Sequence, residues 1–243
     1  MTRQIIRVTG EDREPFLQGL VTNDVNRAPC WAAMLTPQGK YLADFLIVPE
    51  GDALLLDVDA QLTEDLMRRL GMYKLRSKVA IEPSGMTVAR GTGTAPDGAI
   101  ADPRHPALGW RLYGGMGMGD DGSDFDAIRV EHVIPETLVE LIPNETFILE
   151  AGFERLHGVD FRKGCYVGQE VTARMKHKTE LRKGLVTVGI AGKVPVGTPI
   201  LTADGREAGT IFTQSGTRAI AHLRFDRAGQ GLTAQGVAVT ALP

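Results

Sequence analysis

Cysteine is scarce in this sequence. Cys30 and Cys165 are the only two cysteines in 243 residues, and no CxxC pair or Cys/His spacing accompanies either of them. Because a structural zinc ion or an iron–sulfur cluster takes about four protein ligands, this argues against either group being held by this chain alone. We predict no metal site and no disulfide framework.

Long apolar runs are absent as well. No window contains the roughly 18 uncharged apolar residues that a membrane span needs. The first eight residues carry no apolar signal core and no small-residue cleavage site, and their pattern is that of a first strand. We therefore expect a cytoplasmic protein without a membrane partner.

Positive charge is in slight deficit over the whole chain but in excess in one segment. The net charge of −3 argues against a general nucleic-acid binder, so no nucleic-acid partner is expected. Between Asp160 and Lys183, however, seven Lys and Arg residues stand against three acids. Two hypotheses fit this excess: a solvated face, or a site for an anion such as a carboxylate or a phosphate.

Short strands alternating with helices favour an α+β fold for the N-terminal part. Apolar runs predict strands over 4–8, 31–35, 42–48, 54–58 and 79–81. Thr9 or Asp12 is expected to cap a first helix. Asp59 is placed to cap a second, amphipathic helix with leucines every four residues, and Gly71 to end or loosen it.

Residues 83–123 are rich in glycine, proline and aspartate. The glycines of 114–119 have dinucleotide-like spacing, but no apolar strand precedes them and no helix follows, so a flexible loop is favoured over a Rossmann site. Ser123 is expected to cap a helix over 124–133. From Arg182 onward, short β-rich runs and the hairpin signal Asp204-Gly205 indicate a small β-barrel or sandwich.

The most unusual stretch is 161–174. Gly164 and Gly168 flank Cys165 closely, and glycine permits tight turns and close backbone approaches. Arg162 and Lys163 lie just before the cysteine, and a thiol near cations ionises more readily and is more nucleophilic. An ordinary turn with a buried structural cysteine is the alternative.

Residues 163–170, KGCYVGQE, resemble the KGCYxGQE signature of the YgfZ family. These are folate-binding proteins of iron–sulfur cluster biogenesis, related to the aminomethyltransferase (T-protein) of the glycine cleavage system. The extension over 171–174 resembles the mitochondrial branch of the family. Further segments are also similar to it, so that the resemblance covers nearly the whole chain: 8–25, 35–40, 73–79 and 158–161.

The resemblance implies a GcvT-like ring of three small domains, two α+β and a C-terminal β-barrel, around a channel for tetrahydrofolate. We place these domains at 1–82, 83–181 and 182–243. The implied function is assembly or repair of iron–sulfur clusters, with folate and iron–sulfur client or assembly proteins as partners. Whether the protein is an enzyme stays open. The alternative is a folate-dependent aminomethyl or one-carbon transferase of the T-protein type. Two features argue against it: the chain is shorter than a typical T-protein, and the KGCY signature replaces the cysteine-free version expected there.

Folate chemistry suggests roles for the remaining candidates. A reduced pterin offers N–H donors that suit a carboxylate, for which Glu150 and Glu170 are the candidates. The glutamate tail suits cations at the channel mouth. The candidates for that contact and for further cofactor contacts implied by the resemblance are Arg162, Lys163, Arg174, Tyr166, Gln169 and Asp24. Each has a structural alternative: a surface acid for Glu150, an ion pair with Glu170 for Arg174, a core ring for Tyr166 and a turn cap for Asp24.

Three roles for Cys165 stay open: a nucleophile or redox thiol, a transient cluster ligand shared with a partner, or a structural residue. The lack of companion cysteines favours a partner-dependent role. Cys30 precedes an apolar run and is expected in the core.

Overall fold

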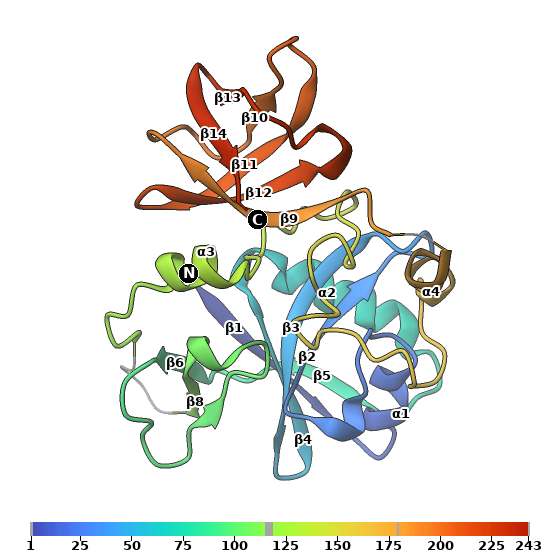
Figure 1. The fold of residues 1–243 in the computed structure, drawn as a ribbon. Helices are drawn as coiled ribbons and strands as arrows, with labels where there is room; N and C mark the ends of the chain where they lie inside the picture. Colours follow the sequence, from blue (N-terminus) through green and yellow to red (C-terminus); the bar gives the residue numbers. More distant parts are fainter. Residues whose placement is uncertain (1, 115–118, 179, 243) are drawn as a thin grey trace. The chain divides into compact units, whose positions relative to one another are not determined.

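The computed structural model describes residues 2–114, 119–178 and 180–242, without the side chain of residue 178 (Figure 1). It contains two compact units, which we describe separately. The first comprises Met1–Ser123 and Glu154–Val171, and the second Asp124–Phe153 and Thr172–Pro243. These units group the residues differently from the predicted three domains, whose boundaries stay a prediction. No helix in the described part of the chain is both long and apolar enough to cross a membrane.

The first unit is built on an antiparallel five-stranded sheet with the strand order β2-β3-β4-β1-β5. The strands are β1 (Arg3–Thr9), β2 (Cys30–Leu35), β3 (Tyr41–Glu50), β4 (Ala53–Asp59) and β5 (Ala80–Pro83). All five were predicted from the apolar runs. The central strands are buried along most of their length, which explains why the runs are continuous rather than alternating.

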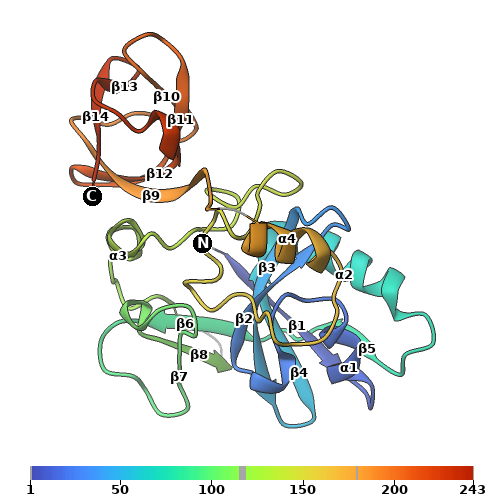
Figure 2. The same ribbon diagram turned by 45° about the vertical axis from the view of Figure 1, so that its right-hand side comes forward.

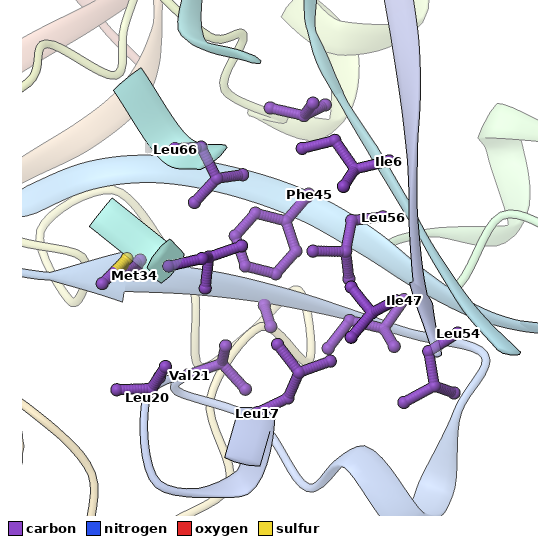
Figure 3. Packing of buried hydrophobic residues seen from close by; sticks show 14 of the residues in the cluster. Ile6, Leu17, Leu20, Val21, Met34, Phe45, Ile47, Leu54, Leu56 and Leu66 are labelled. Atoms are coloured by element: carbon purple, nitrogen blue, oxygen red, sulfur yellow. The ribbon is translucent and has the colours of Figure 1, made fainter. Parts of the chain in front are cut away.

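Two helices accompany this sheet, α1 (Arg13–Gln18) and α2 (Ala60–Lys74). Leu17 of α1 and Leu66 of α2 pack in one cluster with Phe45 of β3 (Figure 3). Asp59 caps α2 as predicted, because its side chain accepts a hydrogen bond from the backbone N–H of Gln61 at 2.8 Å. Of the two effects expected of Gly71, ending or loosening the helix, the first is wrong. The helix continues to Lys74, since one exposed glycine costs only about 1 kcal/mol.

A second sheet lies within the Gly-, Pro- and Asp-rich region 83–123, where the sequence did not indicate its strands. They are β6 (Thr87–Gly91), β7 (Ile100–Ala101) and β8 (Trp110–Gly114), in the order β6-β8-β7. Gly109 makes the approach to β6 possible, because a Cβ there would lie 2.1 Å from the carbonyl oxygen of Gly91. The expected loop over 114–119 falls mostly outside the described residues.

Buried charges join the two sheets of the first unit. Arg111 of β8 donates hydrogen bonds to Asp57 of β4 at 2.7 Å and to Asp102 at 2.8 Å, and all three side chains are at most 2% exposed. Burial would raise the pKa of Asp57, but the charges of Arg3 and Arg111 outweigh it and lower that pKa. The network therefore keeps its carboxylates ionised.

The second unit contains a closed barrel with the strand order β10-β11-β12-β9-β14-β13 (Figure 2). The strands are β9 (Lys183–Ile190), β10 (Thr198–Leu201), β11 (Glu207–Ser215), β12 (Arg218–Arg224), β13 (Leu232–Ala234) and β14 (Val237–Ala241). The C-terminal barrel is thus confirmed, and Asp204-Gly205 turns between β10 and β11 as predicted. Helix α3 (Phe125–His132) also belongs to this unit. Its cap is Asp124, which accepts from the N–H of Ala127, and the prediction of Ser123 is wrong by one residue.

Candidate functional site

The signature forms a loop that runs into a helix, α4 (Gln169–Lys178). Cys165 is exposed at the loop, and a Cβ on the neighbouring Gly164 would meet nothing within 4 Å. Gly168, in contrast, has a φ of +85°, and a Cβ there would lie 2.6 Å from the carbonyl oxygen of Thr36. Gly168 therefore anchors the signature against the turn after β2, while Cys165 stays accessible.

Lys163 turns its side chain into the protein. Its Nζ donates to the carbonyl oxygens of Gln18 at 2.7 Å and Val21 at 2.5 Å, and it lies 5.1 Å from the centre of the Tyr166 ring. The residue is only 8% exposed, and burial lowers its pKa to about 8, although Asp24 opposes the shift. These contacts fasten the signature loop to the 18–21 segment.

The segment 22–24 holds the chain that leads into the signature. Thr22 is fully buried and its hydroxyl donates to the carbonyl oxygen of Gly158 at 2.7 Å. The side-chain amide of Asn23 donates to the carbonyl oxygens of Trp31 and His157, both at 2.7 Å. Neither residue was predicted from the sequence as a support of the site. Their only local signal was the string Thr-Asn-Asp, which is also typical of an ordinary turn.

Asp24 acts as the predicted turn cap. It begins the 3-10 helix Val25–Arg27 and accepts from the N–H of Asn26 at 3.1 Å and from the amide of Gln18 at 3.0 Å. Burial would raise the pKa of Asp24, but these hydrogen bonds and the charge of Arg27 lower it. A folate contact by Asp24 stays a prediction.

Cys30 belongs to the hydrophobic core, as expected. It is 6% exposed, and its pKa is raised to about 12, first by burial and then by Asp24. The two thiols thus differ sharply: Cys30 is buried and neutral, whereas Cys165 is exposed to solvent.

The other signature residues divide between core and surface. Tyr166 is buried, as the structural alternative proposed. Arg162, Glu170 and Arg174 are exposed, and Gln169 is half-buried at the start of α4. Contacts of these residues with a cofactor stay predictions.

Glu150 lies in the second unit, beside a pocket of about 250 Å³. Its Oε2 is 3.3 Å from Nζ of Lys183 on β9 and 3.3 Å from Nε2 of His222 on β12. Burial would raise its pKa, but the hydrogen bond from His222 and the charge of Lys183 lower it. Glu150 is therefore an ionised carboxylate in a hollow rather than a simple surface acid. Its two basic neighbours were not found from the sequence, since they lie on strands more than 30 residues away.

No cluster of three potential metal ligands occurs among the residues that the structure describes.

Comparison with known proteins identifies the family. The mouse protein named iron–sulfur cluster assembly factor IBA57, mitochondrial, is 34% identical over 94% of this chain and 73% of its own length. This chain belongs to the IBA57 family. The human protein of the same name is 30% identical over 91% of this chain and 75% of its own length. A family model described as the CAF17 C-terminal β-barrel domain matches residues 182–243. The resemblance noted in the signature is thereby confirmed.

The fold agrees with a distant solved structure. The glycine cleavage system aminomethyltransferase T from Bartonella henselae matches with a TM-score of 0.73, covering 99% of this chain and 83% of that one. At 11% identity this shows the fold alone, and it confirms the predicted aminomethyltransferase-like fold.

The mouse and human relatives are both named mitochondrial proteins, and this finding corrects the cytoplasmic location expected from the sequence.

Proposed function

We propose that this protein is a tetrahydrofolate-binding accessory factor for the assembly or repair of iron–sulfur clusters, and that it acts through Cys165. The observation that carries the proposal is the exposed thiol on a firmly anchored loop. Lys163 and Gly168 fix the loop on either side of the thiol, so the cysteine is held ready for a partner without a cost of ordering the loop.

In this proposal, the Cys165 thiolate supplies one ligand to the iron of a cluster whose other ligands belong to a client or assembly protein. The cluster is the cargo and does not reside on this chain. A thiolate is a natural ligand for such iron. The membership in a family of iron–sulfur assembly factors supports this role.

Glu150 suits a folate ring. Both of its basic contacts fall on Oε2, which leaves Oε1 as an acceptor for a pterin N–H. The adjoining hollow of about 250 Å³ is smaller than the roughly 300–1,000 Å³ of common ligand pockets, so it fits a ring rather than a whole folate. Tetrahydrofolate, when bound, would supply a carrier for one-carbon units. Glu150, Lys183 and His222 would hold and orient its ring.

Complementation tests the thiol. In a strain lacking this protein, a Cys165→Ala variant should fail to restore the activity of iron–sulfur enzymes, whereas Cys30→Ala serves as the matched control and should restore it. Full rescue by Cys165→Ala would refute the role of the thiol.

Calorimetric titration tests folate binding separately. Glu150→Gln should bind tetrahydrofolate more weakly, and Cys165→Ala should bind it normally. Absence of binding by the unaltered protein would refute the folate proposal.

A second candidate is folate-dependent aminomethyl transfer, which the shared aminomethyltransferase fold favours. Formation of methylene-tetrahydrofolate in a reconstituted glycine-cleavage assay would support it. The exposed cysteine has no part in that reaction, so Cys165→Ala should leave such an activity unchanged.

A further inference from the structure

The first unit contains a pocket of about 440 Å³, and the roles proposed for Cys165 and Glu150 do not use it. It lies between the 23–30 segment, Pro103 and the 154–162 segment that leads into the signature. Its volume is within the range of small-molecule sites, which are usually apolar hollows with a few polar groups. The volume therefore suits a small organic ligand rather than an ion alone.

The walls of the pocket are largely apolar and flat. Pro29, Pro103, Val159 and Phe161 contribute rings and a branched side chain, and the thiol of Cys30 is neutral because burial raises its pKa to about 12. Proline and phenylalanine rings present flat faces that pack well against an aromatic ring. The body of a fitting ligand is accordingly apolar and preferably aromatic.

The rim provides a cation that is not engaged elsewhere. Arg162 is exposed, and no ion pair or side-chain hydrogen bond engages its guanidinium within the ranges that the structure covers. Arg27, in contrast, is already 3.2 Å from Asp160 and 3.5 Å from Asp24. Two acids also line the pocket: Asp160 is the carboxylate that pairs with Arg27, and Glu154 has an interaction of its own. A guanidinium binds a carboxylate through two parallel hydrogen bonds, so Arg162 selects an acid.

The pocket is also preformed. His157 lines it with a φ of +57°, which is uncommon for a residue with a side chain, and its carbonyl oxygen is held by Asn23 at 2.7 Å. Asp160 is fixed through its backbone N–H, which donates to the carbonyl oxygen of Thr22 at 3.1 Å. A preformed wall reduces the ordering cost of binding.

We infer that this pocket binds an aromatic carboxylate, with the ring between the prolines and Phe161 and the carboxylate on Arg162. The inference does not depend on cluster assembly. Two sources share this chemistry: a free aromatic acid, and the p-aminobenzoyl-glutamate end of a folate. If the second source applies, the inference deepens the proposed function by naming the part of folate that the first unit binds.

Nuclear magnetic resonance titration of the full ¹⁵N-labelled chain tests the inference, with phenylacetate, its uncharged analogue phenylacetamide and p-aminobenzoyl-glutamate as probes. We expect phenylacetate to shift the amide signals of residues 157–162, and phenylacetamide to bind about tenfold more weakly or not at all. Tighter binding of p-aminobenzoyl-glutamate than of phenylacetate would identify the folate tail as the source. The reverse order would identify a free acid.

Two variants complete the test. Arg162→Ala should weaken phenylacetate binding about tenfold, whereas Arg218→Ala, an exposed arginine of β12, serves as the matched control and should not change it. His157→Asn keeps a residue that tolerates a positive φ and should retain binding. Absence of shifts with all three probes, equal binding of acid and amide, or unchanged binding by Arg162→Ala would each overturn the inference.

Discussion

At the scale of the residue, Lys163 has an unexpected position. A lysine beside a cysteine predicts a cation that activates the thiol, but the ammonium of Lys163 is directed at two backbone carbonyls of the 18–21 segment. Those acceptors lie 145 and 142 residues earlier in the chain. No local pattern contains that information.

Lys163 should make the free energy of unfolding depend on pH in the alkaline range. Burial lowers its pKa to about 8 from an ordinary value of 10.5. Between these pH values the unfolded chain holds a proton that the folded chain has released, so the stability contributed by this group rises with pH across that window. Urea unfolding at pH 7 and pH 9.5 should show the stability gap between the unaltered protein and Lys163→Met widening with pH. A constant gap would contradict the predicted titration.

The two cysteines should differ in reactivity. Cys165 is exposed, whereas Cys30 is 6% exposed with a pKa of about 12. Since only an accessible thiolate is alkylated readily, brief treatment with iodoacetamide at pH 8 should modify Cys165 and leave Cys30 intact. Peptide mass spectrometry measures both sites in one sample, and denatured protein provides the control in which both react. Equal labelling in the folded protein would contradict the structure.

At the scale of the element, the glycines of the signature have different tasks. Gly168 has a positive φ and is packed against Thr36 and Leu35, where any added Cβ would overlap. Gly168→Ala should therefore lower the free energy of unfolding by about 1–3 kcal/mol. Gly164 has open space around it, so Gly164→Ala is the matched control and should change stability by less than about 0.5 kcal/mol. Thermal or urea unfolding measures both, and equal effects would argue against the packing described.

At the scale of the molecule, buried charge holds the first unit together. Arg111→Met would leave Asp57 and Asp102 buried without their shared partner, and we expect a loss of about 3–5 kcal/mol in unfolding free energy. Arg206→Met removes an exposed, solvent-screened pair with Asp204 and should lower the unfolding free energy much less than Arg111→Met does. Urea unfolding of both variants checks the contrast. A small effect of Arg111→Met would show that the network contributes little.

Elements that follow local rules could be predicted from the amino-acid sequence alone. Continuous apolar runs specified the strands of the large sheet, and the cap at Asp59 specified the start of α2. The eight-residue signature carried the family, because a specific string needs no folding to be recognised. The rising density of short β runs after Arg182 indicated the barrel.

The remaining features arise from contacts between segments that are distant in the sequence. Strands β6, β7 and β8 are short and lie in a region rich in turn residues, and they are held by their pairing with one another. The same holds for the site. The exposure of Cys165, the burial of Lys163 and the basic neighbours of Glu150 all depend on contacts between distant segments. Burial and long-range hydrogen bonds are properties of the folded chain, so local sequence patterns do not specify them.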